Sequence, residues 1–342
     1  MASIEPLTDD AVALTFAVPP ALADDYAFGH GQHLTIRGSD GVRRSFSIST
    51  PASSRRLTIG IKKLPGGAFS DKVLGDLDVD DELEVMTPAG RFTSHLDPTT
   101  GTTYVAVAAG SGITPILSII ATILEEEPLS RVTLIYANRT HRTVMFLDQV
   151  HDLKDRYRER FSLVHVLSRE QQDVELFSGR LDGEQLLRIL AAVEPMPGVD
   201  QWFLCGPQQM VVDLRDTLLA EGVEGTHVHT ELFHADPAPR ASLPPRSVEG
   251  ASHVTIRLDG RSSDFDLDPQ GVGVLEAALE VRSDLPFACR GGVCGTCRAK
   301  LKEGTVAMDV NYALEPEEVE AGYVLTCQSH PTSERVVLDY DA

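Results

Sequence analysis

The chain has 342 residues, more than the roughly 250 to 300 at which a single hydrophobic core stops growing, so we expect two or three domains. Its formal net charge of −21 at pH 7 argues against nucleic acid or an anionic membrane surface as a partner, because both would repel it. A basic docking patch on another protein suits this charge better, although acidic totals also serve plain solubility.

The N-terminal segment "MASIEPLTDD" carries acidic residues and no basic region followed by an apolar stretch, so we expect no secretory signal. No part of the sequence reaches the roughly 18 consecutive apolar residues of a membrane helix. We therefore predict a cytoplasmic protein. In that reducing compartment, clustered cysteines more often bind metal or carry out redox chemistry than form structural disulfides.

Short runs with alternating apolar residues occupy the chain from Ala11 to about Leu96, as in "HLTIRG", "LTIGIK" and "ELEVMTP". Gly, Pro and Asp turns separate these runs. This period of two is typical of antiparallel strands. We therefore predict that residues 1–98 form an antiparallel barrel or sandwich.

Continuous apolar runs begin at Tyr104, namely "YVAVAAG", "VTLIYA", "FSLVHVL" and "QWFLCGP". The longer patterns "PILSIIATILEEE" and "QQMVVDLRDTLLAEG" lie between some of them and have a helical period. Strands that alternate with helices predict a parallel sheet covered on both faces. We assign this domain to residues 99–235.

The segment "HADPAPRASLPPRSVEG" has four prolines and little apolar content, which predicts an extended linker over residues 236–250. After it, "SHVTIRLDGRSSDFDLD" predicts a hairpin, "GVLEAALEV" a short helix and "RVVLDYD" a closing strand. These elements define a third predicted domain at residues 251–342.

The string "CRGGVCGTC" contains Cys289, Cys294 and Cys297 at the spacing C-x4-C-x2-C, and Cys327 follows downstream in "VLTCQSH". This spacing with one distant cysteine is typical of plant-type [2Fe-2S] sites, in which four thiolates hold two irons. The loop glycines let the backbone approach the inorganic sulfurs and donate hydrogen bonds to them. A zinc site would more often use paired C-x2-C motifs, and disulfides conflict with a reducing compartment. We therefore predict that these cysteines bind a [2Fe-2S] cluster.

An iron–sulfur cluster accepts one electron at a time, so a hydride donor needs an intermediary such as a flavin that accepts two electrons and releases them singly. In "RRSFSIST", strand alternation predicts Arg44 and Phe46 on one face and Ser47 on the other. A guanidinium can pair with a phosphate, an aromatic ring can lie against a flavin, and a hydroxyl can bond a ring nitrogen. Taken alone, the same string also describes an ordinary half-buried strand.

The string "KLPGGAFSDKVLGDL" supplies a Gly-Gly turn, then Phe69, Ser70 and a predicted short helix. A helix start with free N–H groups suits a flavin pyrophosphate. Without that context the same residues describe a capped loop.

The predicted nucleotide domain opens with "VAVAAGSGITP", which contains Gly110-x-Gly112-x-x-Pro115. Pro115 takes the last glycine position of the usual dinucleotide fingerprint, and proline is well tolerated at a helix start. A glycine turn between a buried strand and a helix is the expected place for a pyrophosphate. Ser168 and Arg169 follow the strand "FSLVHV" and are a candidate binding site for a 2′-phosphate. An arginine at this position is as often a solvated surface charge.

The string "FLCGPQQM" ends another predicted buried strand with Cys205, Gly206 and Pro207. Ligands bind at this carboxyl edge in open parallel sheets, so Cys205 is a candidate neighbour of a nicotinamide. The alternative is that Cys205 serves only as a small buried hydrophobic residue.

The whole arrangement resembles the ferredoxin–NADP reductase superfamily fused to a C-terminal plant-type ferredoxin. Strings such as "LEVMTPAGRF", "YANRT", "ELFSGRLD" and "MDVNYALE" narrow the resemblance to reductase subunits of phenylacetyl-CoA epoxidases, which are bacterial multicomponent monooxygenases. The resemblance covers nearly the full chain. It implies a multidomain α/β and β fold with an antiparallel FAD-binding β-barrel, a parallel-sheet NAD(P)-binding α/β domain and a C-terminal β-grasp ferredoxin domain.

The resemblance also implies roles for individual residues. The family motif R-x-Y-S falls on Arg44, Phe46 and Ser47, which would hold the flavin pyrophosphate, stack on the ring and bond near its reactive nitrogen. Phe46 replaces the family's tyrosine, which keeps the stacking face and removes a hydroxyl bond. The motif G-x-x-S falls on Gly67 and Ser70, on the adenylate side of FAD.

The resemblance also implies a nucleotide-binding site. The residues that would line the nucleotide pyrophosphate are Gly110, Gly112, Thr114 and Pro115. The "SRE" string resembles NADPH-selective members, so we expect NADPH to be preferred, with NADH as the alternative donor. Cys205 matches the cysteine near the nicotinamide, and Glu231 and Phe233 in "ELF" match the segment beside the flavin. The expected catalytic residues are Ser47, Cys205 and Glu231. The remaining expected cofactor contacts are Ile48, Ile61, Phe69, Arg139, Gly206 and Pro207.

The resemblance implies electron transfer from NADPH through FAD and a [2Fe-2S] cluster to a di-iron oxygenase acting on phenylacetyl-CoA in phenylacetate degradation. One alternative keeps the cofactors, with FMN in place of FAD as a further option, but serves a ring-hydroxylating or steroid-hydroxylating oxygenase. A more distant alternative is a redox-sensing or interaction protein without catalysis, which predicts missing ligands. All four cysteines and the glycine turns are present, which argues against it.

Overall fold

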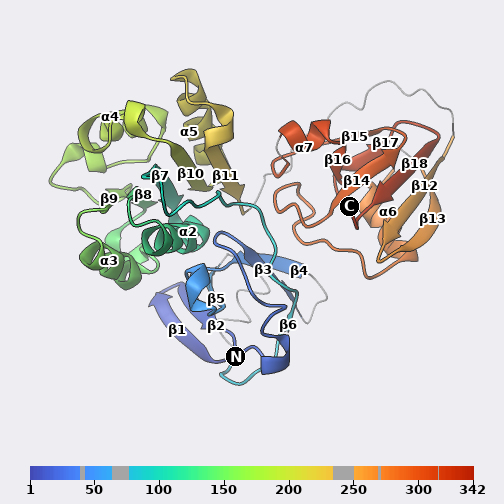
Figure 1. Cartoon of the computed structure of the whole chain (residues 1–342), viewed down its shortest axis with the longest axis horizontal. Helices are drawn as coiled ribbons and strands as arrows, with labels where there is room; N and C mark the ends of the chain where they lie inside the picture. Colours follow the sequence, from blue (N-terminus) through green and yellow to red (C-terminus); the bar gives the residue numbers. More distant parts are fainter. Residues whose placement is uncertain (39–42, 64–76, 234–249, 269–270, 315) are drawn as a thin grey trace. The chain divides into compact units, whose positions relative to one another are not determined.

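The computed structural model describes residues 1–38, 43–63, 77–233, 250–268, 271–314 and 316–342. The chain divides into two compact units, Met1–Glu231 and Leu232–Ala342 (Figure 1). Within the described ranges, none of the helices has both the length and the apolar content needed to span a bilayer.

The N-terminal strands form the antiparallel sheets β1-β2-β5 and β4-β3-β6. Their bounds are β1 Ser3–Thr8, β2 Ala11–Thr15, β3 His33–Arg37, β4 Arg43–Ser47, β5 Thr58–Lys62 and β6 Glu84–Val85. Leu14, Leu34 and Ile59 come from both sheets and are fully buried in one hydrophobic cluster. The predicted barrel is therefore confirmed, because alternate residues of these strands turn inward.

Strand β1 is absent from the sequence-based prediction, and its composition explains why. The strand "SIEPLT" contains Pro6 and has no fully buried residue. It lies at the edge of its sheet, and its register with β2 shifts between Pro6 and Thr8. Proline and a bulge are tolerated at an edge strand, where one side of the backbone needs no partner strand.

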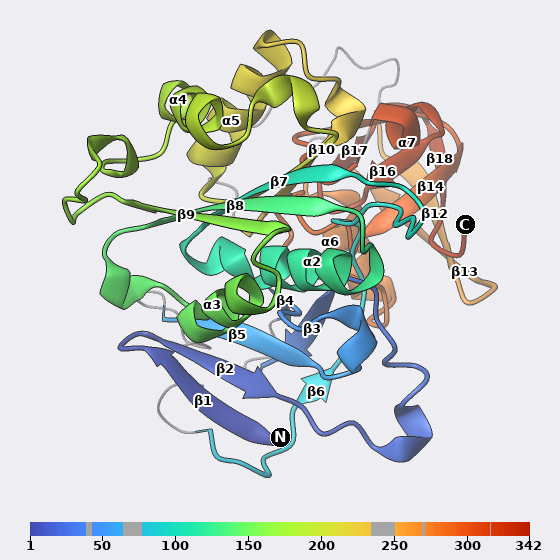
Figure 2. The ribbon, with the colours of Figure 1, turned by 60° about the vertical axis from the view of Figure 1, so that its left-hand side comes forward.

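The second part of this unit is a five-stranded sheet in the order β11-β10-β7-β8-β9. Its elements are β7 Thr103–Ala109, α2 Ile113–Glu126, β8 Arg131–Asn138, α3 Leu147–Arg156, β9 Phe161–Leu167, α4 Gly183–Val193, β10 Gln201–Gly206, α5 Gln208–Ala220 and β11 Val228–Leu232. Strands β7 to β10 pair in parallel, and Figure 2 shows α2 and α3 on one face of the sheet with α4 and α5 on the other. The continuous apolar runs thus formed the predicted parallel sheet with two covered faces.

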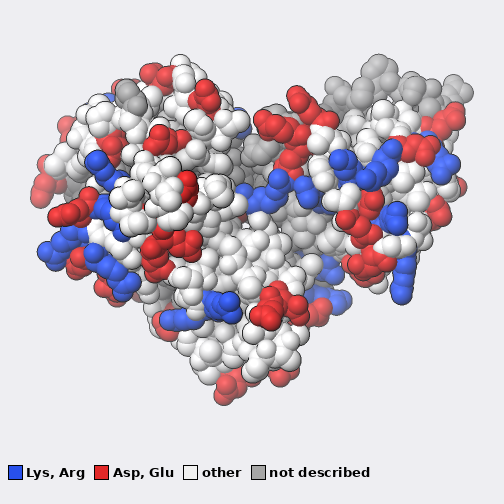
Figure 3. All heavy atoms as spheres, viewed as in Figure 1, with Lys and Arg blue, Asp and Glu red and all other residues white. Residues whose placement is uncertain are grey.

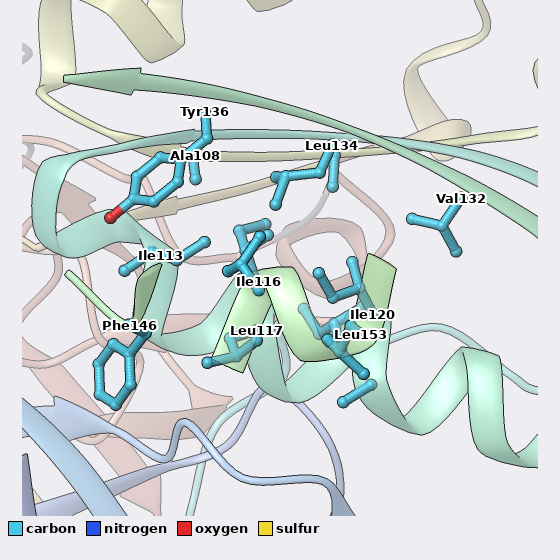
Figure 4. Packing of buried hydrophobic residues seen from close by; sticks show 14 of the residues in the cluster. Ala108, Ile113, Ile116, Leu117, Ile120, Val132, Leu134, Tyr136, Phe146 and Leu153 are labelled. Atoms are coloured by element: carbon cyan, nitrogen blue, oxygen red, sulfur yellow. The ribbon is translucent and has the colours of Figure 1, made fainter. Parts of the chain in front are cut away.

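Helix α2 is buried along nearly its whole length, from Ile113 to Leu124. Figure 4 shows Ile113, Ile116 and Ile120 of this helix packed in one cluster with apolar side chains of the sheet. Two of its polar residues form hydrogen bonds with the barrel. Ser118 Oγ donates to Thr50 O at 2.7 Å, and Thr122 Oγ1 accepts from Ala52 N at 3.1 Å. A helix that is apolar nearly all round is expected between two layers, and α2 lies between the sheet and the barrel.

Helix α3 is also absent from the sequence-based prediction. Its sequence "LDQVHDLKDR" is mostly polar, and only Val150 and Leu153 are buried. Two buried positions are too few to give a periodic signal in the sequence, although they suffice to place the helix on the sheet.

The C-terminal unit contains a mixed sheet in the order β13-β12-β18-β14-β16 and a small β15-β17 sheet. Its elements are β12 Ser252–Leu258, β13 Arg261–Leu267, α6 Val274–Val281, β14 Arg298–Glu303, β15 Val306–Met308, α7 Pro316–Glu320, β16 Tyr323–Leu325, β17 Ser329–Pro331 and β18 Arg335–Asp339. The predicted hairpin, short helix and closing strand are confirmed as β12–β13, α6 and β18. Val274 of α6 packs with Ile256 and Leu338 in the core below the sheet, which is the predicted β-grasp arrangement.

Some predicted features lie outside the described residues. They are Gly67, Phe69 and Ser70 of the predicted pyrophosphate loop and nearly all of the predicted linker.

Candidate functional site

Strand β4 presents its side chains alternately to its two faces, as the strand prediction requires. Ser45 and Ser47 share one face, and Arg44 and Phe46 share the other. Arg44 and Phe46 are half-buried, and Phe46 packs against the barrel core. Ser47 is buried, and its Oγ donates a hydrogen bond to Oε2 of Glu231 at 3.0 Å. A barrel strand and the edge strand β11 are thereby joined through side chains.

The carboxyl of Glu231 lies among protein atoms, and this burial raises its pKa to about 8, although the hydrogen bond from Ser47 acts in the opposite direction. Cys205 lies on the neighbouring strand β10 and is fully buried. Burial, followed by the nearby Glu231 charge, raises the pKa of the Cys205 thiol well above its usual range. The three residues predicted to be catalytic are therefore close together, and at neutral pH Glu231 holds a proton there.

The glycine turn follows β7 as a short 3-10 segment, Gly110–Gly112, and leads into α2. Gly110 has φ +54°, and a Cβ built on it would meet no atom within 4 Å, so this point of the turn is open. No side chain in the described chain caps the start of this segment or of α2. The turn therefore has an open backbone at Gly110 and no capping side chain, which suits an anionic pyrophosphate.

Tyr136 of β8 holds this turn in place, although it is not among the predicted site residues. Its hydroxyl oxygen lies 3.1 Å from the backbone oxygens of both Gly110 and Met145, and these two acceptors share its single hydrogen. Nothing in "VTLIYA" indicates that this tyrosine reaches a loop 26 residues away in sequence. The parallel pairing of β7 and β8 brings the two together.

Gly112→Ala should disrupt the turn. A Cβ at this position would lie 2.3 Å from the backbone oxygen of Cys205, and backbone cannot yield as a flexible side chain can. We expect a loss of about 1–3 kcal/mol in unfolding free energy and weaker nucleotide binding. Thermal unfolding and NADPH titration would measure both effects.

Gly198→Ala is the matched control for Gly112→Ala, because a Cβ at Gly198 would meet nothing within 4 Å. We expect this control to behave like the wild type. Equal unfolding temperatures for the two variants would contradict the close approach of Gly112 to Cys205.

Thr114 and Pro115 form the first turn of α2, and both are buried. Thr114 Oγ1 donates to Ser111 O at 3.0 Å, and its methyl group lies close to Gly60 of β5. Ile48 and Ile61 are fully buried in the barrel core. Thr114 and Pro115 thus adjoin the turn, whereas Ile48 and Ile61 belong to the barrel core, and their predicted cofactor contacts stay predictions.

Arg139, Ser168 and Arg169 are exposed together at the carboxyl ends of β8 and β9. Their backbones continue the parallel ladder, because Arg169 N donates to Arg139 O at 2.8 Å and Ser168 N donates to Asn138 O at 2.9 Å. Two exposed guanidinium groups and a hydroxyl at this edge could hold a phosphate.

Gly206 and Pro207 lead from β10 into α5. A Cβ on Gly206 would lie 2.9 Å from the Cβ of Ala109, so the two strand ends approach closely. Phe233 follows β11 and keeps 39% of its surface exposed. Its predicted contact with the flavin stays a prediction.

The four predicted cluster ligands form two contacting pairs, Cys289 with Cys294 and Cys297 with Cys327. The hydrogen bond from Cys294 lowers the pKa of the Cys289 thiol. Within the described part of the chain, no three His, Cys, Asp or Glu side chains converge as a single metal ion would require. Two pairs of thiols can supply two thiolates to each of two irons.

The backbone around these cysteines has the conformation that the loop glycines predicted. Gly292 and Gly295 have φ +75° and +67°, and Gly291 N donates to Cys289 Sγ at 3.4 Å. A Cβ on Gly292 would lie 3.1 Å from a methyl group of Val310, so the loop lies against the segment after β15. The loop thus brings backbone N–H groups to the sulfur atoms, as a cluster site requires.

Family models match most of the chain. A 2Fe-2S iron-sulfur cluster binding domain matches residues 256–332, an oxidoreductase NAD-binding domain matches 106–216, and an oxidoreductase FAD-binding domain matches 1–94. FAD, a pyridine nucleotide and a [2Fe-2S] cluster are therefore the cofactors of this fold.

Two curated relatives extend the comparison over the full length. The chain is 42% identical to one subunit of the 1,2-phenylacetyl-CoA epoxidase of Escherichia coli (strain K12), an alignment that covers 100% of this chain and 97% of that protein. The chain belongs to this family of oxygenase reductases. The "3-ketosteroid-9-alpha-monooxygenase, ferredoxin reductase component" of Mycobacterium tuberculosis is 33% identical, over 98% of this chain and 93% of that one.

Solved structures show the same fold for this reductase. Phthalate dioxygenase reductase superimposes with a TM-score of 0.59 at 24% identity, over 99% of this chain and 96% of that one. An intact type IV self-sufficient cytochrome P450 monooxygenase gives 0.72 at 23% identity, and the match covers 98% of this chain and 40% of that one. The reductase is thus an NAD(P)H-dependent flavin and iron–sulfur oxidoreductase, and an oxygenase is its class of partner.

Proposed function

We propose that this reductase transfers electrons from NADPH through FAD and a [2Fe-2S] cluster to a di-iron oxygenase that epoxidises phenylacetyl-CoA during phenylacetate degradation. The pairing of Cys289 with Cys294 and of Cys297 with Cys327 is the observation that carries the electron-transfer role. The identity of the oxygenase is inferred from the relative in Escherichia coli (strain K12).

The flavin site in this proposal uses residues of the barrel. Arg44 would pair with the pyrophosphate, Phe46 would lie against the ring, and Ser47 would bond near the reactive nitrogen. Gly67 and Ser70 would hold the adenylate side. The half-buried positions of Arg44 and Phe46 on one face of β4 support these roles.

The nucleotide site in this proposal lies at the carboxyl edge of the parallel sheet. The open turn at Gly110 would receive the pyrophosphate, and Arg139, Ser168 and Arg169 would receive the 2′-phosphate of NADPH. Cys205 would lie beside the nicotinamide.

Bound FAD and the cluster supply the chemistry, namely acceptance of a hydride and release of its two electrons one at a time. The residues of the chain position the reactants and hold a proton near them. Glu231 holds that proton at neutral pH, and Ser47 Oγ keeps the carboxyl in place through its 3.0 Å hydrogen bond.

The domain bounds of the proposal are residues 1–98, 99–235 and 251–342, joined by a linker at 236–250. A cytoplasmic location also belongs to the proposal. A reducing compartment keeps the four cluster cysteines available as thiolates, and all five cysteines of the chain are free.

Arg169→Ala tests the nucleotide preference. Loss of one charge-assisted contact to the 2′-phosphate should weaken NADPH by about tenfold in kcat/KM and leave NADH nearly unchanged. Reduction of the bound flavin with each nucleotide under anaerobic conditions measures both values. Exposed Arg188, on α4, provides a matched control as Arg188→Ala, and equal losses for both nucleotides in Arg169→Ala would contradict the assignment.

The proposed partner is tested by adding purified oxygenases to the reduced protein. The phenylacetyl-CoA epoxidase should accept electrons faster than a steroid-hydroxylating or ring-hydroxylating oxygenase. The Mycobacterium tuberculosis relative makes the steroid system the principal alternative, and faster transfer to that oxygenase would replace the proposed partner.

Electrostatic docking can be measured in the same assay. The net charge is −21, and Figure 3 shows acidic side chains interspersed with basic ones on the visible face. Transfer to a basic partner surface should slow as ionic strength rises, and a flat dependence would exclude an electrostatic contribution.

A further inference from the structure

Gln328 lies directly after the fourth cysteine, at the point where the two cysteine-bearing segments meet. Its Nε2 lies 2.8 Å from the backbone oxygen of Arg290, 3.2 Å from that of Cys327 and 3.5 Å from Cys327 Sγ. The side chain therefore spans from the three-cysteine loop to the segment that carries the fourth ligand.

The orientation of this amide is fixed by its partners. The two backbone oxygens near Nε2 can only accept hydrogen bonds, so the nitrogen and not the oxygen of the amide must face them. The same nitrogen is therefore the atom that approaches Cys327 Sγ. The amide has two hydrogens, so one can bond Arg290 O while Cys327 O and Cys327 Sγ share the other, and a distance of 3.5 Å suits a shared hydrogen bond to the larger sulfur atom.

The surroundings of Gln328 hold it in this position. Its backbone N donates to Leu325 O at 2.9 Å, and its backbone oxygen accepts from Asp309 N at 2.9 Å. A Cβ on Gly292 would lie only 3.2 Å from Gln328 Cγ, so the side chain packs closely on the loop backbone. Gln328 is half-buried, and ordered contacts on both sides limit its rotamers.

Arg290, whose backbone oxygen Gln328 binds, has an unusual conformation. Its φ is +54°, a left-handed value that costs energy for a residue with a side chain. It lies between Cys289 and Gly291, directly after the first cysteine of the loop. A hydrogen bond to its oxygen stabilises this conformation.

We propose that Gln328 is a positioning residue that clamps the three-cysteine loop to the Cys327 segment and raises the reduction potential of the cluster by donating a hydrogen bond to Cys327 sulfur. The proposal rests on the four-cysteine ligand set of the proposed function. Reduction adds one negative charge, part of which falls on the sulfur ligands. An N–H donor therefore stabilises the reduced form more than the oxidised form.

Gln328→Met tests the proposal, because methionine has a similar length and no N–H donor. We expect the equilibrium constant for one-electron reduction to fall about tenfold, which lowers the midpoint potential by about 59 mV. We also expect faster release of iron to a chelator, by about tenfold or more. Redox titration followed by electron paramagnetic resonance gives the potential, and iron release is followed by absorbance.

Gln328→Glu is the second variant. It keeps the shape of the side chain but offers no donor and adds a negative charge, so the potential should fall further than in Gln328→Met. The control is Gln171→Met, the same substitution at an exposed glutamine of the other unit, which should leave both readouts unchanged. A Gln328→Met protein that purifies without iron, keeps its flavin and cannot be reloaded with iron and sulfide supports the clamp.

The outcomes separate this inference from the function on which it rests. Equal potentials and equal iron-release rates in the wild type and in Gln328→Met would overturn the role of Gln328. Absence of a paramagnetic signal from the reduced wild-type protein would instead overturn the ligand set.

Discussion

Cys327→Ser should abolish electron delivery to the oxygenase and remove the paramagnetic signal of the dithionite-reduced protein. Cys327 is the only one of the four ligands outside the short loop, and it pairs with Cys297. A serine oxygen is a harder and more weakly binding ligand for iron than a thiolate, so one iron loses half of its protein ligands. We expect electron transfer to fall to background in a steady-state assay with the oxygenase.

The flavin part of the reaction provides the internal control for Cys327→Ser. NADPH-dependent reduction of an artificial acceptor that takes electrons from the flavin should stay close to that of the wild type. Ser329→Ala controls for local disturbance, because it removes the hydroxyl bond to Leu325 O at 2.8 Å in the same segment without removing a ligand. A Cys327→Ser protein with an unchanged paramagnetic signal would exclude Cys327 as a ligand.

Glu231→Gln should remove a pH dependence near 8 from NADPH-dependent flavin reduction. Glu231 is neutral below its raised pKa of about 8 and ionised above it. Hydride transfer brings negative charge to this region, so the ionised carboxylate should slow the reaction as pH rises through 8. Glutamine keeps the shape and the neutral state, and its rate should stay level across this range in stopped-flow measurements.

The same substitution should change stability with a definite sign. The pKa of Glu231 is raised from 4.5 to about 8 on folding, so the carboxyl favours the folded state most below about 4.5 and loses that advantage as pH rises through 8. Glu231→Gln should therefore raise the unfolding temperature relative to the wild type at pH 9 and have little effect at pH 5. A pH profile that is identical in Glu231→Gln and the wild type would contradict the role of Glu231.

Ser47→Ala, which removes the donor to Glu231, should slow flavin reduction by about 10²-fold.

The parts of the fold that can be predicted are those whose signal is local. Strands β7 to β10 are buried on both faces, so each one reads as a continuous apolar run in the sequence. Edge strand β1 and the polar helix α3 could not be predicted, because each has few apolar positions of its own and depends on contacts with neighbouring elements.

The site divides in the same way. The cysteine spacing predicts the cluster, but only the folded loop shows which cysteines pair. Ser47 and Glu231 are 184 residues apart in sequence and meet only because β4 and β11 come together. Tyr136 and Gln328 act through backbone oxygens, which leave no mark on the sequence at either end.

Helix α2 has a consequence for how such proteins can be recombined. Its residues from Ile113 to Leu124 are covered by the sheet on one side and by the barrel on the other. A cut near residue 98 would expose one apolar face of helix α2 to water and would remove the layer that covers the barrel. Shuffling of whole modules between genes should therefore move the barrel and the parallel sheet as one block that ends after β11, at Leu232.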